Sequence, residues 1–367
     1  MPWMSGRTFE TAFVEPRNNF DVLRLVAALA VLFGHGFVLT AGKLTPETAD
    51  PVSALLMMAT PWEEAIHEFA VNVFFVISGF LVASSWVRGP RIWRFVTARV
   101  LRIFPAAMVC ALLTVGTLSM ISTVDAGSYF GSEDTWRFLV KNALILSTEY
   151  HLPGVFEDNP YAGVVNGSLW TLPLEIRCYV ILAVLGLLGL LQRQALFNLA
   201  ALAVAISITV PGWSQWISGS EDKIRLLVFF VAGAAMFINR RFLPTGGRGI
   251  LFFLGLTLAY ALWPAGMAGE KLLYIILVSH AVLGVAFSRW FTFISLKPLG
   301  DWSYGVYLYA FPVQQALVHF FPQTFNGWTL LIAASSITCV LAAASWHLIE
   351  KRALRLRHRL PTKLPIG

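Results

Sequence analysis

The chain has 367 residues, of which 57% are hydrophobic and only 13% are charged. This composition excludes an ordinary soluble globular protein, in which about 45–50% apolar and about 25% charged residues are usual. The formal net charge of +7 does not indicate nucleic-acid binding, because the Lys and Arg residues are scattered between apolar runs instead of forming one patch. We therefore expect one membrane domain and no nucleic-acid partner.

Ten apolar segments of the length needed to cross a bilayer follow one another along the chain. They lie near residues 20–40, 65–87, 103–122, 168–190, 195–211, 224–239, 249–265, 271–288, 303–321 and 326–347. The three cysteines fall inside apolar segments without the paired spacing of a metal site or a disulfide framework. The sequence predicts an all-α integral membrane protein, a bundle of about ten transmembrane helices, with no metal site.

The distribution of basic residues predicts the side of the membrane on which the termini lie. Nineteen Lys and Arg residues fall on the side of the termini, two lie within spans, and six lie on the other side: Lys43, Arg137, Lys141, Lys223, Arg225 and Lys271. Both termini are therefore expected in the cytosol. The predicted regions are a cytosolic segment (1–19), a transmembrane domain (20–347) and a basic cytosolic tail (348–367).

The longest loop between spans, residues 123–167, falls on the outer side and is acidic. Within it, residues 135–147 (TWRFLVKNALILS) are too short and too charged to span, which predicts an amphipathic helix lying along the membrane interface. The loop is also the natural platform for an extracytoplasmic acceptor.

Two ionisable side chains lie in the first span, where a charge costs at least ~2.5–3.5 kcal/mol. Arg24 and His35 are eleven residues apart, so they share a helical face and differ in depth by ~16 Å. Gly34 and Gly36 flank His35 and leave room for a backbone or a thin ligand. The stripe indicates a channel, whereas the alternative is ordinary helix packing in which the histidine bonds a neighbour.

The fourth span begins with Asn166-Gly-Ser-Leu-Trp-Thr-Leu-Pro-Leu-Glu-Ile-Arg and carries Glu175 ~10 Å into the bilayer. His35 reaches a similar depth in its own span, so the two side chains are candidates for an acid/base pair. The alternative is an ion pair of Glu175 with Arg177 or another buried base. His280, near the middle of a later span, is interpreted as a hydrogen-bonded packing residue.

The loop before the third span is rich in arginine, and Phe104-Pro105 is expected to open the helix that follows. Positive-inside topology explains such a cluster. However, Arg99 and Arg102 are three residues apart and share a helical face, and arginine suits bidentate phosphate contacts. A cytosolic phosphate ligand is therefore a second interpretation.

Five motifs follow one another along this profile. They are NNFDVLRLVAALAVLFGHGF (18–37), FFVISGFLV (74–82), ARVLRIFPA (98–106), NGSLWTLPLEIRCY (166–179) and WSYGVYLYAFPV (302–313). In this order they make the sequence similar, along essentially the whole chain, to the acyltransferase-3 family of membrane acyltransferases. The fourth motif most resembles the branch of that family that modifies exopolysaccharides and related glycans.

The resemblance implies roles for particular residues. Arg24 and His35 match the family's essential basic residue and histidine, Arg99 and Arg102 its cytosolic arginine pair for the acyl-CoA donor, and Trp170 and Glu175 its tryptophan and acidic positions. We therefore expect His35 and Glu175 to be catalytic and Arg24, Arg99 and Arg102 to bind the donor. Trp170 is an expected substrate-binding residue, together with Asn166, Ser168 and Tyr304 of the fourth and fifth motifs. One departure is Ala310, where many relatives have a histidine, so no role is carried over there.

The resulting expectation is a membrane O-acyltransferase of the bacterial cytoplasmic membrane. It would transfer an acyl group, acetyl or succinyl, from cytosolic acyl-CoA to a hydroxyl of a polysaccharide or lipid-linked oligosaccharide, with no permanently bound cofactor. Membrane lipids and other glycan-assembly proteins are the further expected partners. The alternatives are a proton-coupled transporter or flippase, in which the buried ionisable residues relay protons, and a non-catalytic partner of a glycan synthase.

Overall fold

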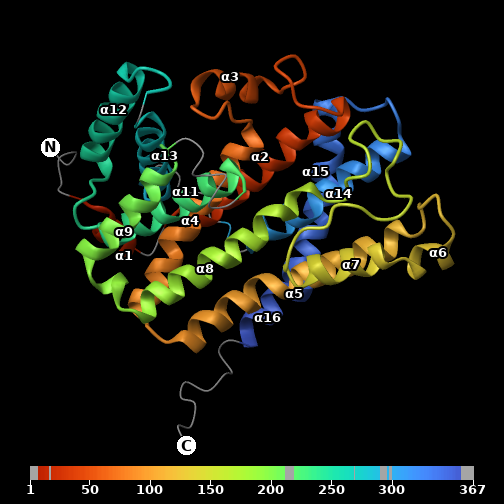
Figure 1. Ribbon diagram of the computed structural model, residues 1–367, viewed down its shortest axis with the longest axis horizontal. Coiled ribbons are helices and arrows are strands. Elements are labelled where there is room, and N and C mark those ends of the chain that lie inside the picture. Colours follow the sequence, from red (N-terminus) through yellow and green to blue (C-terminus); the bar gives the residue numbers. More distant parts are fainter. Residues whose placement is uncertain are drawn as a thin grey trace, which may run out of the picture. The chain divides into compact units, whose positions relative to one another are not determined.

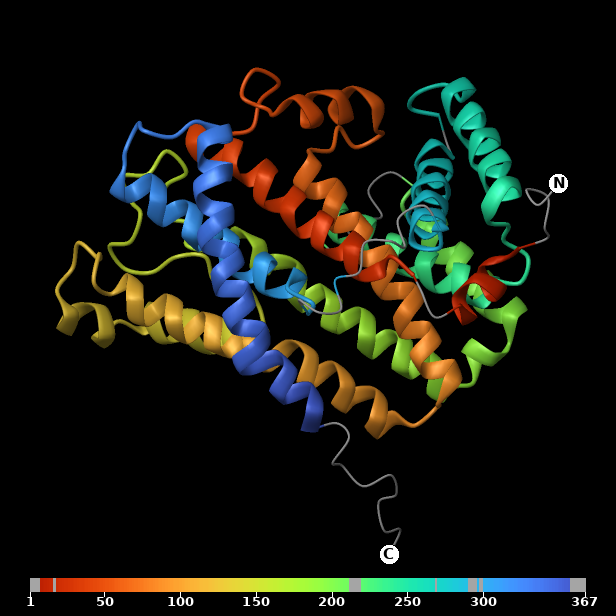
Figure 2. The same cartoon turned by 180° about the vertical axis from the view of Figure 1, so that it is seen from behind.

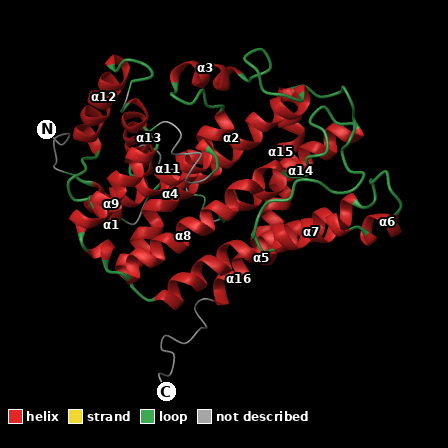
Figure 3. Cartoon of the chain, in the orientation of Figure 1, coloured by secondary structure: helices red, strands yellow, loops and turns green. Residues whose placement is uncertain are grey.

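The computed structural model describes residues 7–15, 18–210, 219–267, 269–289, 296 and 300–356. Within these ranges the regular structure is helical (Figure 3). Thr8 and Pro244 form an isolated β-bridge. The helices are α1 (Phe9–Val14), α2 (Phe20–Ala41), α3 (Pro51–Ala59), α4 (Ile66–Arg88), α5 (Ile92–Leu118), α6 (Ala126–Gly131), α7 (Glu133–Ala143), α8 (Thr171–Leu187), α9 (Gln194–Ser207), α11 (Glu221–Ile238), α12 (Gly246–Leu262), α13 (Glu270–Ala286), α14 (Ser303–Phe320), α15 (Gly327–Ser345) and α16 (Lys351–Leu356).

Each of the ten segments predicted to span the membrane carries a helix (Figure 1). Among the described residues, five helical stretches are long and apolar enough to cross a membrane: 20–41, 66–88, 92–118, 167–187 and 327–356. Two shorter apolar helices are α9 and α12. The protein is therefore an all-α membrane protein.

The prediction that Phe104-Pro105 opens the helix of the third span is wrong. Helix α5 begins at Ile92, eleven residues before the predicted start at 103, and runs through Pro105 instead of beginning there. Arginine and leucine favour helix, so the polar segment continues the apolar one without a break. In membrane helices an interior proline is tolerated because neighbouring groups satisfy the freed carbonyl. Arg99 and Arg102 consequently lie on the helix itself and not in a loop.

The chain forms two compact units. Unit 1 comprises residues 1–31, 51–90 and 174–296, and unit 2 comprises 32–50, 91–173 and 297–367. Helices α2 and α8 contribute residues to both units.

In unit 1, α4 and α11 pack closely against each other. Small residues permit this, since Gly79 lies against the backbone of Phe230 and Gly233 lies against the backbone of Val76. Below this contact, Phe80 is fully buried among aromatic rings. The reciprocal glycines explain why these helix axes come near each other without side chains between them.

The N-terminal segment is a packed part of unit 1. Helix α1 is capped by Thr8, and Phe9 is 0% exposed and stacks on His280 with ring centroids 5.3 Å apart. Glu15 pairs with Arg7 at 2.7 Å and with Arg289 at 3.1 Å. Residues 1–6 and 16–17 of the predicted segment lie outside the described residues.

In unit 2, α14 and α15 lie side by side, as both ribbon views show (Figure 2). Gly305 makes room for this by lying against the backbone of Ala342. The start of the predicted tail is helical, because a short π-helix (Trp346–Glu350) leads directly into α16, which packs on α5. Residues 357–367 of that tail lie outside the described residues.

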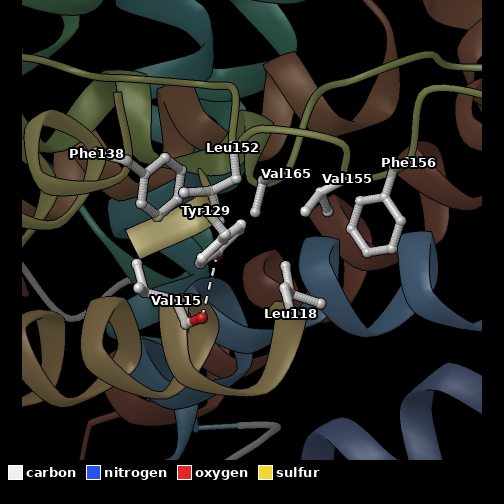
Figure 4. Close-up of a cluster of buried hydrophobic side chains, with 8 residues drawn as sticks. All are labelled: Val115, Leu118, Tyr129, Phe138, Leu152, Val155, Phe156 and Val165. Atoms are coloured by element: carbon white, nitrogen blue, oxygen red, sulfur yellow. Dashed lines mark hydrogen bonds between the residues drawn. The ribbon is translucent and has the colours of Figure 1, made fainter. Parts of the chain in front are cut away.

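The loop predicted at 123–167 has its own hydrophobic core against the end of α5 (Figure 4). Tyr129 is 0% exposed, and its hydroxyl donates to the Val115 carbonyl at 3.1 Å. Phe138 of α7 and Phe156 pack in the same cluster. Helix α7 lies along α5 (Figure 1). It corresponds to the amphipathic helix predicted at 135–147, but it ends four residues earlier, at Ala143.

Candidate active site

His35 lies in the last two turns of α2, where it meets α14 within unit 2. The imidazole is half-buried, and its ring contacts Phe311 in a T-shaped arrangement, with centroids 5.1 Å apart. The same phenyl ring lies against Gly167, since a Cβ added there would be 2.6 Å from Phe311 Cε2. One aromatic ring therefore contacts both His35 and the start of the fourth motif, which are about 130 residues apart in sequence.

Gln314 joins α14 to α2 one turn further on. Its side-chain Nε2 donates to the Leu32 carbonyl at 2.8 Å and lies 3.3 Å from the Cβ that Gly36 lacks. The carbonyl of Gly327, at the start of α15, is also 3.3 Å from that position. Close helix packing thus accounts for Gly36, which was the alternative to a channel in the sequence analysis. Gln314, which is 0% exposed, was not predicted from the sequence, although a glutamine within an apolar span is a recognisable signal.

The first residues of the fourth motif are anchored on α14. The Asn166 side chain donates to the Leu308 carbonyl at 2.9 Å, and its Oδ1 accepts from the Ser168 amide at 3.1 Å. Tyr307 donates to the Ser168 carbonyl at 2.7 Å, and its hydroxyl is 2.6 Å from that of Thr171. These bonds satisfy the backbone where the chain enters α8 through the 3₁₀ turn Gly167–Trp170.

The preceding segment of the outer loop is held by amide side chains. Asn159 donates to the backbone and side-chain oxygens of Gln315 at 3.0 and 2.8 Å. Gln315 in turn donates to the carbonyls of Tyr161 and Val164 at 2.8 and 2.7 Å. The loop is thus fastened to α14 on both sides of the predicted substrate-binding residues.

Of the predicted substrate-binding residues, Asn166, Ser168 and Trp170 lie in this anchored segment of unit 2. Asn166 is 1% and Ser168 2% exposed, and Trp170 is half-buried. Tyr304 lies about two turns before Phe311, at the start of α14, ~10 Å along the helix. Asn166 and Ser168 thus flank Gly167, which lies against the ring that contacts His35, and Trp170 ends the same turn, whereas Tyr304 lies beside Arg102.

Glu175 lies in unit 1 on α8 and accepts hydrogen bonds from two hydroxyls. Ser78 of the second motif donates at 3.1 Å, and the hydroxyl of Tyr179, one turn further along α8, also bonds the carboxylate. Arg177, the alternative partner, is exposed. Ser78 and Tyr179 were not predicted from the sequence as partners of Glu175. A polar side chain within an apolar span is the signal that could have identified them. Because His35 belongs to unit 2, its pairing with Glu175 stays a prediction.

Arg24 lies on the same continuous helix as His35, as the spacing predicted. Its guanidinium donates to Asp21 at 2.7 Å, one turn nearer the start of α2. An acidic residue in the first turn of a helix is favourable, because it faces the positive end of the helix dipole. Asp21 thus supplies a counter-charge for Arg24 near the helix end.

The predicted donor-binding arginines differ in their surroundings. The Arg99 guanidinium lies over the Phe95 ring at 4.2 Å and donates to the Phe95 carbonyl at 3.3 Å. Arg102 pairs with Asp301 at 2.6 Å and with Glu350 at 3.4 Å, and its guanidinium is 5.8 Å from the Tyr304 ring. Arg102 is therefore part of an ion-pair cluster with two carboxylates in unit 2.

The two carboxylates of this cluster were not found from the sequence. Glu350 is 1% exposed and also accepts from Ser345 at 3.0 Å, while Asp301 accepts from the Ser303 hydroxyl. Tyr304 donates to the Ile103 carbonyl at 3.0 Å beside them. Tyr304 therefore lies beside Arg102, one of the predicted donor-binding residues.

His280 has the surroundings of a packing residue. It is 2% exposed, its Nε2 is 3.4 Å from the Gly249 carbonyl, and its ring lies 4.8 Å from Phe252. Within the described residues, no three His, Cys, Asp or Glu side chains lie close enough together to hold a metal ion.

Comparisons with known proteins agree with the resemblance. The family model described as an acyltransferase domain, Acyl_transf_3, matches residues 17–347. The chain is 31% identical to an O-acetyl transferase of Shigella phage Sf6, over 92% of this chain and 96% of that protein. It is 28% identical to Nodulation protein 10 of Rhizobium leguminosarum bv. viciae, over 94% and 95% of the two chains. It is also 25% identical to a putative membrane-bound transacylase, BcsY, of Komagataeibacter xylinus, over 79% and 77%.

No solved structure matches the chain. The family model extends over the whole of the ten-segment region, and the first two relatives are matched over almost their full lengths. The chain belongs to the acyltransferase-3 family of membrane acyltransferases.

Proposed function

We propose that this protein transfers an acyl group, acetyl or succinyl, from cytosolic acyl-CoA to a hydroxyl of an extracytoplasmic or lipid-linked glycan. Family membership supports acyl transfer, and the relative named O-acetyl transferase supports a hydroxyl acceptor. The transporter and flippase alternatives have no comparable support. The observation that carries the proposal is the convergence of His35, Phe311 and the Gly167 backbone within unit 2.

The proposed topology has ten spans, with both termini in the cytosol of a bacterium and the helices in its cytoplasmic membrane. Helices at all ten predicted segments support the number of spans. The excess of Lys and Arg on the side of the termini supports the orientation. In this orientation the arginines of α5 face the cytosol, and His35 lies toward the outer side.

In the proposed reaction, His35 acts as a general base. It removes the proton from an acceptor hydroxyl while the hydroxyl oxygen attacks the thioester carbonyl, and the CoA thiolate leaves. Phe311 fixes one side of the imidazole, and a carboxylate such as Glu175 would orient the ring and stabilise its positive charge. An alternative mechanism that passes through an acyl-enzyme intermediate would be distinguished from this direct transfer by ping-pong kinetics.

The donor end of the proposed site lies at Arg99 and Arg102. Guanidinium groups bind phosphates through paired hydrogen bonds, which suits the nucleotide end of acyl-CoA. Arg99 presents its charge over an aromatic ring, whereas Arg102 is already held by two carboxylates. We assign both arginines to the phosphate end of the donor and give Arg102 the further role of holding Asp301 and Glu350, with Arg24 further along the path of the donor.

The test is acyl transfer by the purified protein in lipid nanodiscs. Radiolabelled acetyl-CoA and succinyl-CoA are offered with a panel of methyl glycosides, and labelled product is measured for the wild type and for His35→Ala. We expect transfer by the wild type and a loss of about 10²–10⁴-fold in the variant, the usual contribution of general-base catalysis. His280→Gln is the matched control, because this buried histidine has a packing role.

A wild type that transfers no label to any acceptor would refute the function. Equal transfer by the wild type and His35→Ala would refute the site. Movement of a fluorescent glycolipid across the bilayer without acylation would support the flippase alternative instead.

A further inference from the structure

Two buried oxygen atoms near His35 have no hydrogen-bond partner in the part of the chain that the structure describes. They are the Oγ of Ser168 and the Oε1 of Gln314. Ser168 is 2% exposed and Gln314 is 0% exposed. Leaving a buried polar group unsatisfied lowers the stability of a protein, and buried polar side chains are as a rule hydrogen-bonded. Two such atoms in one region indicate a role in binding.

The orientation of the Gln314 amide follows from its bonded neighbour. One of its terminal atoms lies 2.8 Å from the Leu32 carbonyl oxygen, which can only accept a hydrogen bond. That terminal atom must therefore be the nitrogen, and the other must be the oxygen. The unpartnered atom offers lone pairs and no proton, so its ligand must bring a hydrogen-bond donor.

Gln314 belongs to one stripe of α14, and Ser168 lies in the 3₁₀ turn that is hydrogen-bonded to another residue of that stripe. Tyr307, Phe311 and Gln314 are spaced i, i+4 and i+7, which places them on one helical face. Tyr307 holds the Ser168 carbonyl, Phe311 contacts His35, and Gln314 reaches α2 beside Gly36. The stripe is ~10 Å long, so its two ends would engage different groups of one ligand.

We propose that Gln314 and Ser168 are the hydroxyl-binding residues of the acceptor site and that they select a neutral polyhydroxylated acceptor. The proposal rests on the proposed O-acyltransferase function and adds Gln314 and the chemistry of recognition. A sugar brings O–H donors to Gln314 Oε1 and both donors and acceptors to Ser168 Oγ. A phosphate or carboxylate brings acceptors only, and would leave the Gln314 oxygen unsatisfied. A further hydroxyl of the same sugar would then face His35.

The experiment measures steady-state kinetics of Ser168→Ala and Gln314→Leu in nanodiscs, with labelled acetyl-CoA and the most active methyl glycoside of the panel. We expect the KM for the glycoside to rise about tenfold or more in each variant, the equivalent of one lost hydrogen bond. The KM for acetyl-CoA should stay within about twofold of the wild type, because these residues are assigned to the acceptor.

Thermal unfolding separates binding from a merely structural role. The Ser168 hydroxyl has no hydrogen-bond partner among the described residues, so Ser168→Ala should keep or raise the Tm while it weakens binding of the glycoside. A structural residue would show a lower Tm and an unchanged KM. Because Gln314→Leu also loses the bond to Leu32, its Tm is expected to fall, and the Ser168 variant remains informative if the Gln314 variant does not fold.

Thr338→Val is the matched control. Thr338 is 0% exposed, and its Oγ1 is also without a partner within the described ranges, but it lies on α15 ~16 Å from Gly327. This variant should leave the glycoside KM unchanged. If Ser168→Ala and Gln314→Leu also leave it unchanged while the wild type transfers acetyl and His35→Ala does not, the acceptor proposal is overturned and the enzyme function stands. A wild type without transfer would instead remove the proposed function.

Discussion

The rings of His35 and Phe311 meet at 78° with their centroids 5.1 Å apart, and this contact joins α2 to α14 within unit 2. Because the phenyl ring is also lodged against Gly167, it has little freedom to turn. The contact therefore fixes one side of the imidazole. A general base works only when its nitrogen is aimed at the proton it removes, so the ring that aims it should matter for the rate.

Phe311→Leu tests this relationship. The substitution keeps most of the apolar volume, so the free energy of unfolding should fall by only about 1–1.5 kcal/mol. The imidazole would lose its fixed neighbour, and kcat should fall by about 10²-fold, as expected for a displacement near 1 Å. The measurement is kcat by labelled transfer, together with the Tm. Phe229→Leu in unit 1 is the control, since Phe229 is also fully buried, and an equal loss of kcat there would contradict the role of Phe311.

A second prediction concerns the close approach at Gly167. A methyl group there would lie 2.6 Å from Phe311 Cε2, so Gly167→Ala must displace the ring or the 3₁₀ turn. Overpacking of this kind costs about 1–3 kcal/mol, and we expect most transfer activity to be lost with it. Gly116→Ala is the matched control, because no atom lies within 4 Å of the added Cβ. This variant should be slightly more stable, by about 0.5–1 kcal/mol, and fully active. Thermal unfolding and labelled transfer check both.

The two arginines of α5 should respond differently to removal. Arg99→Ala is expected to raise the KM for acetyl-CoA about tenfold or more with little change in Tm, since charge-assisted bonds to phosphate are lost. Arg102→Ala would leave Glu350, which is 1% exposed, without its cation, a change that costs about 3–5 kcal/mol for a buried pair. The double variant Arg102→Ala/Glu350→Gln should recover much of that stability. Equal effects of both single variants on Tm would argue against this division of roles.

The pH dependence of stability should report a buried acid before α4. Burial raises the pKa of Glu64, although the charge of Arg225 and hydrogen bonds from Tyr274 and Asn72 oppose the rise. Since the folded pKa lies above the unfolded one, the stabilising contribution is complete below the unfolded pKa of about 4.3 and is lost as the pH rises through the folded pKa.

The free energy of unfolding should therefore decrease between about pH 4 and neutral pH through this residue. Glu64→Gln is neutral at every pH and should flatten that part of the profile. Thermal unfolding in detergent at a series of pH values is the measurement. Glu63→Gln, at the exposed neighbouring residue, is the control. An unchanged slope in the Glu64 variant would contradict the prediction.

Helix α7 offers a test of the interfacial prediction. Trp136 and Val140 are 51% and 47% exposed, lie one turn apart on one face, and are opposite to the buried Phe138. A spin label at residue 140 should be reached by dissolved oxygen more readily than by a water-soluble nickel reagent, because an interfacial helix buries its apolar face at the edge of the acyl chains. Apolar oxygen partitions into that region and the polar nickel reagent does not. A label at Asp134, which lies on the charged side of the same helix, should show the reverse order. Equal accessibility at the two sites would place α7 in water.

The family and the class of all-α membrane protein could be predicted from the sequence, because both depend on short motifs and apolar runs. Apolar runs of span length report the solvent of a helix whatever its neighbours are, and all ten carry helices. The spacing of Arg24 and His35 on one helix also needed no tertiary information. The start of α5 was missed for a related reason, since Pro105 is a local helix-breaking signal that tertiary packing overrides.

The contacts of the site were decided by tertiary structure alone. Which ring faces His35, and which backbone leaves room for that ring, depends on side chains of α14 and the 3₁₀ turn, which are far from His35 in sequence. Gln314 could be seen as a polar residue in an apolar span, but its bond to Leu32 and its unpartnered oxygen could not. Hydropathy fixes how deep a residue lies along its own helix. Only the packing of helices against one another determines which face meets which, and so which groups can act together.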